Sequence, residues 1–323
     1  MNRLRLLTAL AAATALGALP IASAQGWPDK QVRILVPAPA GSSLDVLART
    51  LGDKLKDKFN QTVVVENKPA AGGTVATSEV AKSAPDGHTI LLGFNGPLST
   101  GPLIRTVPYD VQKDLAPVVI TSSQPNVLAV NAALPIRNVA ELVAWAKANP
   151  GKLTYASVGN GSSSHLNAEL LRSMAGIDAV HVPFNGSPPA VLSTVQGDTQ
   201  MIFAVMQPLQ AQVQAGKLRA IAVTTTKRFR LLPELPTIAE SGYAGFEALA
   251  WNGLMVPAAT PRPVIDRINA EVNTIFRMPD VLQKMNGLGF DLIGGPPEDF
   301  AKLLRDEAAL WTPVVKKLGL KVD

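Results

Sequence analysis

Small and polar residues gather in five short segments, each directly after an apolar, strand-like run. The residues concerned are Ala38, Pro39, Ala40, Gly41, Ser42, Ser43 and Asp45 in the first segment, Asn95 and Gly96 in the second, Ser157, Gly159, Asn160, Gly161, Ser162, Ser163 and His165 in the third, Phe184, Asn185 and Gly186 in the fourth, and Met206 in the fifth. Glycine and hydroxyl residues just before a helix leave backbone N–H groups accessible at the positive end of the helix dipole, so such turns bind anions. The five segments therefore predict a binding site for a small carboxylate.

Ordinary helix capping is the alternative for any single segment, because Ser42 or Ser43 and Ser163 or Ser164 would satisfy a helix start without a ligand. Asp45 suits the first turn of a helix and is expected to be structural rather than to touch the ligand. None of the five segments contains Lys or Arg. A carboxylate bound there would depend on backbone N–H groups, hydroxyls, amides and ordered water, which favours a ligand of modest charge.

Catalytic patterns are weak throughout the chain. His88, His165 and His181 are far apart in sequence without metal-ligand spacing, and the chain has no cysteine. Ser162 lies near His165, but residues this close rarely present nucleophile and base correctly, and the Gly-x-Ser-x-Gly elbow is absent. The Gly-x-Gly at 159–161 lacks the third glycine of a dinucleotide fingerprint. We expect no catalytic residue, no metal and no cofactor.

Short β-rich runs alternate with helical patterns along most of the chain, which is typical of an α/β fold. Apolar residues at helical spacing predict amphipathic helices between the runs, and the C-terminal part is mostly helical. Ligands of α/β sheets bind beyond the carboxyl ends of the strands, which is where the five segments fall. The expected strands are 32–36, 63–66, 89–93, 118–121, 127–130, 154–157, 179–182, 201–204 and 220–223.

Two segments, 118–130 and 246–256, run from one strand-like stretch into another without a helix. We interpret them as crossings between two lobes, because a chain that crosses twice provides two hinge strands and a cleft that can close. The first lobe would be discontinuous and would comprise residues 25–124 plus 249–323. The second lobe would comprise residues 125–248. Each lobe is expected to hold a central, mostly parallel sheet flanked by helices.

Residues 1–24 have the pattern of a cleavable signal peptide, with two arginines before an apolar run at 6–19 and Ala-Ser-Ala at 22–24 as the cleavage signal. The mature chain would begin near Gln25. An uncleaved membrane anchor is the alternative, but Pro20 interrupts a run shorter than the roughly 20 apolar residues that span a bilayer. Because no cysteine follows the signal, a lipid anchor is not expected. These features predict a periplasmic protein.

The charge balance argues against a nucleic-acid partner. Removal of the two signal-peptide arginines lowers the formal net charge from +5 to about +3, and the remaining charges are scattered along the chain. Such an excess is too small and too dispersed to attract nucleic acid. Without coiled-coil heptads or an obvious association motif, a monomer is expected.

The chain resembles the substrate-binding receptors of tripartite tricarboxylate transporters, also called the Bug family. The resemblance spans essentially the whole mature chain, and the order and spacing of its motifs are more specific than any one motif. The motifs are WPDKQVRILVP at 27–37, VENKPAAGG at 65–73, YASVGNGSSSHL at 155–166, HVPFNG at 181–186, GKLRA at 216–220 and LPTIAESG at 235–242.

The resemblance implies a type II periplasmic binding protein, a two-lobed Venus-flytrap fold that closes on a small organic acid and delivers it to membrane permease subunits. It also implies that backbone groups and bridging waters at 40–43 and 157–163 hold the ligand carboxylate. Two other functions stay open. One is a periplasmic hydrolase or isomerase that uses His165 or Ser162, and the other is a ligand-loaded sensor that docks on a signalling partner.

The sequence departs from the family pattern at four positions. Ala38 stands where the family usually has Phe or Tyr, and Ser42 replaces the second glycine of Ala-Gly-Gly. Asn185 replaces a common Lys, and Gln200 occupies a usual Asp position. These changes predict a roomier and less charged cleft, and hence a bulkier or aromatic monocarboxylate as the ligand.

Overall fold

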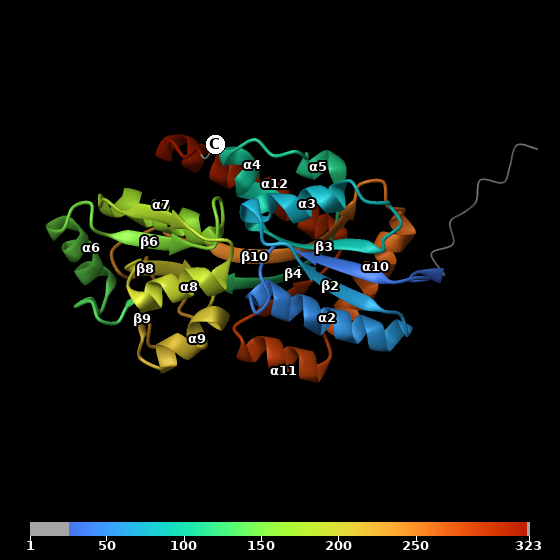
Figure 1. Cartoon of the computed structure of the whole chain (residues 1–323), viewed down its shortest axis with the longest axis horizontal. Coiled ribbons are helices and arrows are strands. Elements are labelled where there is room, and N and C mark those ends of the chain that lie inside the picture. Colours follow the sequence, from blue (N-terminus) through green and yellow to red (C-terminus); the bar gives the residue numbers. More distant parts are fainter. Residues whose placement is uncertain (1–25, 322–323) are drawn as a thin grey trace, which may run out of the picture.

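The structure, a computed structural model, describes residues 26–321 and contains two β-sheets with helices on their faces (Figure 1). The expected signal peptide at 1–24 lies outside the described residues. The strands of the larger sheet are β1 (Val32–Val36), β2 (Val63–Asn67), β3 (Thr89–Phe94), β4 (Leu115–Pro125), β10 (Leu249–Pro257) and β11 (Asp291–Gly294). The strands of the smaller sheet are β5 (Val127–Asn131), β6 (Thr154–Ser157), β7 (Val180–Pro183), β8 (Met201–Ala204) and β9 (Leu218–Val223).

The strand order is β11-β4-β10-β3-β1-β2 in the larger sheet and β7-β6-β8-β5-β9 in the smaller. Parallel pairs join β1 to β2 and β3, and β6 to β7 and β8. Strand β10 is antiparallel to β3 and β4, and β5 is antiparallel to β8 and β9. Both sheets are therefore mixed rather than mostly parallel, because the strands at the crossing run against their neighbours.

Helices cover both faces of the larger sheet. On one face, the apolar sides of three helices pack against the strands and form one hydrophobic core. On the other face, the apolar sides of two helices form a second core with the strand residues that point that way. The first group is α2 (Ser43–Phe59), α10 (Arg262–Ile275) and α11 (Pro279–Gly287), and the second is α3 (Thr74–Ala81) and α12 (Pro297–Leu318). Because both faces are covered, the central strand β3 is buried at every position except its last.

The smaller sheet is covered in the same way. Helices α6 (Val139–Ala148) and α7 (Ser163–Ala175) pack on one face, and α8 (Ser187–Gln196) and α9 (Met206–Gln214) pack on the other. Four short helical segments complete the described elements: η2 (Ala71–Gly73), the π-helical η3 (Gly96–Thr100), α4 (Gly101–Ile104) and α5 (Val111–Asp114). Each helix among residues 26–321 is too short or too polar to cross a bilayer.

The chain passes between the two sheets at two adjacent places. Only Asn126 separates the end of β4 from the start of β5, so the chain enters the smaller sheet without a helix. It returns through β10, in which Leu249 pairs with Pro125 and Ala250 pairs with Gln124. The two crossing chains therefore lie side by side in one antiparallel ladder.

A small apolar cluster joins the two halves behind the cleft. It contains Ile104 of α4, Leu166 of α7, Ala248 before β10, and Trp311 and Val315 of α12. Figure 1 shows the C-terminal end of α12 reaching over α7, in agreement with this packing. The C-terminal helix thus contacts both halves of the molecule.

Candidate functional site

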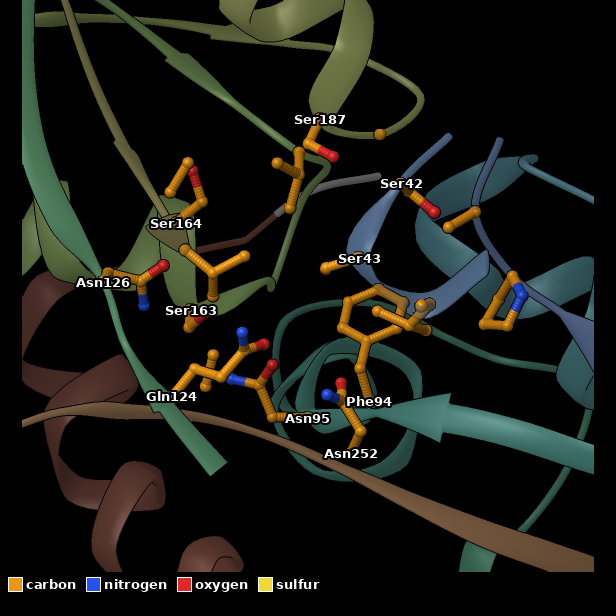
Figure 2. Close-up of a pocket in the computed structure, with 18 residues that line it drawn as sticks. Ser42, Ser43, Phe94, Asn95, Gln124, Asn126, Ser163, Ser164, Ser187 and Asn252 are labelled. Carbon is orange, nitrogen blue, oxygen red and sulfur yellow. The ribbon is translucent and has the colours of Figure 1, made fainter. Parts of the chain in front are cut away.

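A cavity lies between the two sheets, where the strand ends of both halves meet (Figure 2). Small and polar side chains dominate its wall, and Phe94 supplies an aromatic surface. Its lining residues are Pro37, Ala38, Ser42, Ser43, Leu44, Phe94, Asn95, Gln124, Asn126, Val158, Ser163, Ser164, Gly186, Ser187, Ala204, Val205, Ala250 and Asn252. None of the residues that line this cavity within the described range 26–321 carries a charge.

The start of α2 brings Ser42 and Ser43 to the cavity from the larger-sheet side. Ser42 is the N-cap of α2, and its hydroxyl accepts a hydrogen bond from the Asp45 N–H at 3.3 Å. Asp45 accepts from the Gly41 N–H at 2.9 Å and forms an ion pair with Arg49 at 2.9 Å. Burial opposes ionisation, but these bonds keep the pKa of Asp45 below its ordinary value. Asp45 braces the loop and does not line the cavity.

The start of α7 brings Ser163 and Ser164 to the cavity from the opposite side. Its N-cap Ser162 accepts from the His165 N–H at 3.3 Å and donates to the Gly159 carbonyl at 2.6 Å. Ser164 donates to the Phe203 carbonyl of β8. Figure 2 shows the serines of the two helix starts on different walls of the same cavity. The arrangement is suited to an anion, because both positive helix ends point at one space.

A stack of three rings supports the α7 loop from behind. The rings of His165 and His181 lie 4.1 Å apart between centroids, and those of Tyr155 and His181 lie 4.8 Å apart. The Gly161 N–H donates to Nδ1 of His165 at 3.2 Å, and Nε2 of His181 lies 2.6 Å from Oγ of Ser157. His165 is thus occupied in holding the loop and does not line the cavity.

Burial lowers the pKa values of both histidines. Desolvation, with a smaller contribution from Arg172, lowers the pKa of His165 to about 4. Desolvation, with repulsion from His165, lowers the pKa of His181 to about 3. Both rings are therefore neutral near pH 7, which is the state in which Nδ1 of His165 can accept the bond from Gly161.

Six of the residues expected at the site line the cavity: Ala38, Ser42, Ser43, Asn95, Ser163 and Gly186. Others lie nearby without lining it, including the capping residue Ser162, the buried Ser157 and Gly96, and the exposed Ala40 and Asn185. Met206 lies in the apolar core between the smaller sheet and its helices, because its side chain packs beside Leu209. Phe184 packs at the edge of that same core.

Several of the expected glycines lie at contacts between the two halves, and Gly186 both makes such a contact and lines the cavity. A Cβ atom on Gly161 would lie 3.0 Å from Cα of Gly101, and one on Gly186 would lie 2.3 Å from Cδ of Pro39. The Thr100 hydroxyl donates to the Gly161 carbonyl across the same contact. At Gly161 glycine is needed for the close approach of two backbones, and at Gly186 it leaves room for the ring of Pro39. Gly159 and the carbonyl of Asn160 also lie at a contact between the halves, against Gly72.

The crossing strands contribute wall residues that the five segments did not include. Gln124, Asn126 and Asn252 are between 1% and 3% exposed, although each lies in or beside an apolar strand. A carboxamide inside a strand that is otherwise buried is the sequence signal that could have pointed to them, because buried polar groups need a partner. No group of His, Cys, Asp and Glu among residues 26–321 has a metal-binding arrangement.

A two-lobed α/β fold with a cavity between its lobes is the architecture of periplasmic solute-binding proteins. The chain belongs to the tripartite tricarboxylate transporter family receptors, whose model matches residues 47–320. BugT of Bordetella pertussis strain Tohama I is 35% identical to it over 326 residues, which cover 100% of both chains. The structure of Rpa4515 of R. palustris with adipate matches with a TM-score of 0.89 and 33% identity, over 91% of this chain and 99% of that chain.

The structure of the periplasmic binding protein BugD matches with a TM-score of 0.87 and 32% identity, over 91% of this chain and 99% of that chain. The two-lobed fold and the family inferred from the sequence motifs are confirmed. Proteins of this family and fold are solute-binding receptors rather than enzymes.

Proposed function

We propose that this protein captures a small organic carboxylate between its lobes and delivers it to the permease subunits of a tripartite tricarboxylate-type transporter. The observation that carries this proposal is the convergence of two helix starts on one cavity from opposite halves, with Ser42 and Ser43 on one side and Ser163 and Ser164 on the other. A carboxylate there would receive backbone N–H and hydroxyl donors from both halves. The adipate in the Rpa4515 structure supports the ligand class.

The lobes that we propose are residues 25–124 plus 249–323 and residues 125–248. The two sheets support these limits, since β1 to β4, β10 and β11 form one sheet and β5 to β9 form the other. A ligand that touches both lobes can do so only when the lobes are shut, so binding would shift the population toward the closed form. Closure is the signal that a permease would recognise.

The ligand that we propose is a monocarboxylate with a bulky or aromatic body. The uncharged wall supports a single carboxylate, because a second buried anion without a cation is costly. Ala38 leaves room on the wall, and Phe94 offers a ring against which an aromatic body could stack.

Export, processing and assembly also belong to the proposal. Residues 1–24 would direct export and be removed, and the mature protein would be periplasmic, monomeric and free of a lipid anchor. The absence of catalytic activity is proposed as well, since His165 is occupied by the Gly161 N–H.

The first test is native mass spectrometry of the mature protein purified without denaturation, followed by identification of any small molecule released on acidification. One carboxylic acid per chain, released unchanged, is the expected result. If the protein is empty, a thermal-shift panel of organic acids replaces the first step. Release of a chemically altered acid would favour a hydrolase or isomerase instead.

A further inference from the structure

Two carboxamides at the crossing between the lobes have polar atoms without a partner. Gln124 and Asn126 are each 1% exposed, and both line the cavity. Among residues 26–321, Nε2 and Oε1 of Gln124 and Nδ2 of Asn126 have no hydrogen-bond partner. Figure 2 shows the Gln124 and Asn126 side chains at the cavity, with Asn95 beside Gln124. Buried polar atoms of this kind are normally paired, so a ligand or water must complete them.

The backbone around these carboxamides is held in place. The Asn126 N–H donates to Oγ1 of Thr224 at 2.9 Å, and that hydroxyl donates to the Ala248 carbonyl at 2.7 Å. Gln124 pairs in the ladder with Ala250, whose small side chain also lines the cavity. The backbones of Gln124 and Asn126 are therefore held at the floor of the cleft, where both crossing strands meet, while the polar atoms of the side chains stay available.

The carboxamide of Asn252, which also lines the cavity, is oriented by a hydrogen bond between the two crossing strands. Nδ2 of Asn252 on β10 donates to Oγ of Ser122 on β4 at 3.0 Å, which orients the Asn252 side chain across the two crossing strands. The floor consequently offers carboxamide donors and acceptors together, without an ammonium or guanidinium group. A second carboxylate could only accept hydrogen bonds and would add an unbalanced charge, whereas a carboxamide or hydroxyl can both donate and accept.

We infer that Gln124 and Asn126 are specificity residues that bind an uncharged donor and acceptor group of the ligand other than its carboxylate. The ligand is then a monocarboxylate that also bears a neutral hydrogen-bonding group, such as a carboxamide or a hydroxyl. This inference rests on the proposed function, because the helix starts must hold the single carboxylate.

Two matched series of acids test the inference by isothermal titration calorimetry. The first series is hexanoate, adipamate and adipate, and the second is 4-methylbenzoate, 4-carbamoylbenzoate and terephthalate. Within a series only the far group changes, from apolar to carboxamide to carboxylate. We expect the carboxamide to bind about tenfold more tightly, or better, than both other members of at least one series. Tighter binding of the dicarboxylate in the wild-type protein would overturn the inference.

The Gln124→Met variant keeps the length of the side chain and removes its hydrogen bonds. We expect it to weaken binding of the carboxamide about tenfold and to leave the apolar member within about threefold. Gln112→Met, on an exposed residue of α5, is the control and should match the wild type. Equal weakening of all three acids by Gln124→Met would contradict a role in specificity. Should the variant not fold, the wild-type series alone decides.

The outcome also separates this inference from the proposed function. A protein that binds no carboxylate, whether added or recovered on purification, refutes the proposed function. If none of the six compounds binds but an acid is recovered from the purified protein, a neutral hydrogen-bonding group on that acid supports the inference. A second carboxylate on the recovered acid, or a wholly apolar body, contradicts it. Binding of the six acids without preference among far groups refutes only the inference.

Discussion

Ala38 is a small residue on a cavity wall that also carries the ring of Phe94. Its 7% exposed methyl group leaves space that a larger side chain would fill. The size of the residue at this position should therefore affect bulky ligands more than small ones.

We expect Ala38→Phe to weaken the binding of benzoate about tenfold or more, because the added ring takes up ligand volume. Succinate, which is smaller, should change by less than about threefold and serves as the internal control. Titration calorimetry with both acids measures the difference. If the wild type prefers succinate and the variant binds both acids as before, the idea of a roomier cleft is wrong.

The neutral stack of His165 and His181 predicts that acid destabilises the protein. Their pKa values of about 4 and 3 lie below the ordinary value of 6.5, so the folded chain binds fewer protons than the unfolded chain in that interval. Stability should therefore fall as the pH decreases from about 6.5 to about 4, by up to about 1.4 kcal/mol per pH unit for each histidine. Urea unfolding at pH 7, 6 and 5 measures this slope.

His165→Asn separates this effect from other titrations. Asparagine can still accept the Gly161 N–H but does not titrate, so the slope between pH 7 and pH 5 should become shallower. An unchanged slope would show that His165 is not responsible for the acid sensitivity.

At single residues, the sequence was most informative where local chemistry decides the position. Ser42 was recognisable because a hydroxyl just before an apolar helical stripe caps that helix, and the structure places it at the N-cap of α2. The N-cap of α7 is Ser162, one residue before the Ser163 or Ser164 that the sequence suggested. Gln124 and Asn126 were missed. Their carboxamides in an apolar stretch were a signal, but the face toward which a strand residue points depends on its pairing register. Gly161 was expected at the ligand and lies instead against Gly101 of the opposite lobe, because a distance across the cleft is a tertiary property.

At the scale of elements, the alternation of strands and helices predicted the α/β class and both helix starts at the cleft. The strand directions at the crossing were not predictable, because β10 pairs with β4 across more than a hundred intervening residues. The short strand β11 and the π-helical turn η3 were also missed, since four or five residues carry too little periodicity.

Gly253 shows how closely α12 is packed on the crossing strand. Its backbone conformation is open to any residue, but a Cβ atom there would lie 2.3 Å from the ring of Phe300 on α12. We expect Gly253→Ala to lower the free energy of unfolding by about 1–3 kcal/mol through overpacking. Gly287→Ala, at the exposed end of α11 with nothing within 4 Å, should be neutral or slightly stabilising. Equal effects of the two variants in urea unfolding would rule out this packing constraint.

At the scale of the whole molecule, the lobes meet at one place where two backbones approach without side chains between them. Gly161 and Gly176 both have positive φ angles, of 78° and 59°. A Cβ atom on Gly161 would meet the backbone of Gly101 in the other lobe, whereas one on Gly176 would meet nothing within 4 Å. A comparison of alanine at Gly161 with alanine at Gly176 therefore separates the effect of the added methyl group on closure from the loss of stability that alanine causes in a left-handed backbone conformation.

We expect Gly161→Ala to weaken ligand binding about tenfold or more and to reduce the ligand-induced compaction seen by small-angle X-ray scattering. Gly176→Ala should lose a similar amount of stability from backbone strain but keep the affinity and compaction of the wild type. Ligand binding that is weakened equally in the two variants would show that the contact at Gly161 does not control closure.

Pro125 at the end of β4 pairs with Leu249 at the start of β10, so the segment between them leaves the larger sheet and returns to it at neighbouring residues. A segment that leaves and rejoins its host at neighbouring residues can be removed and replaced without stretching either end. Residues 126–248 could therefore be replaced as a unit by the corresponding segment of a relative, joined at the same two points. Half of the ligand site could then be exchanged by recombination, while the other half keeps its own sequence.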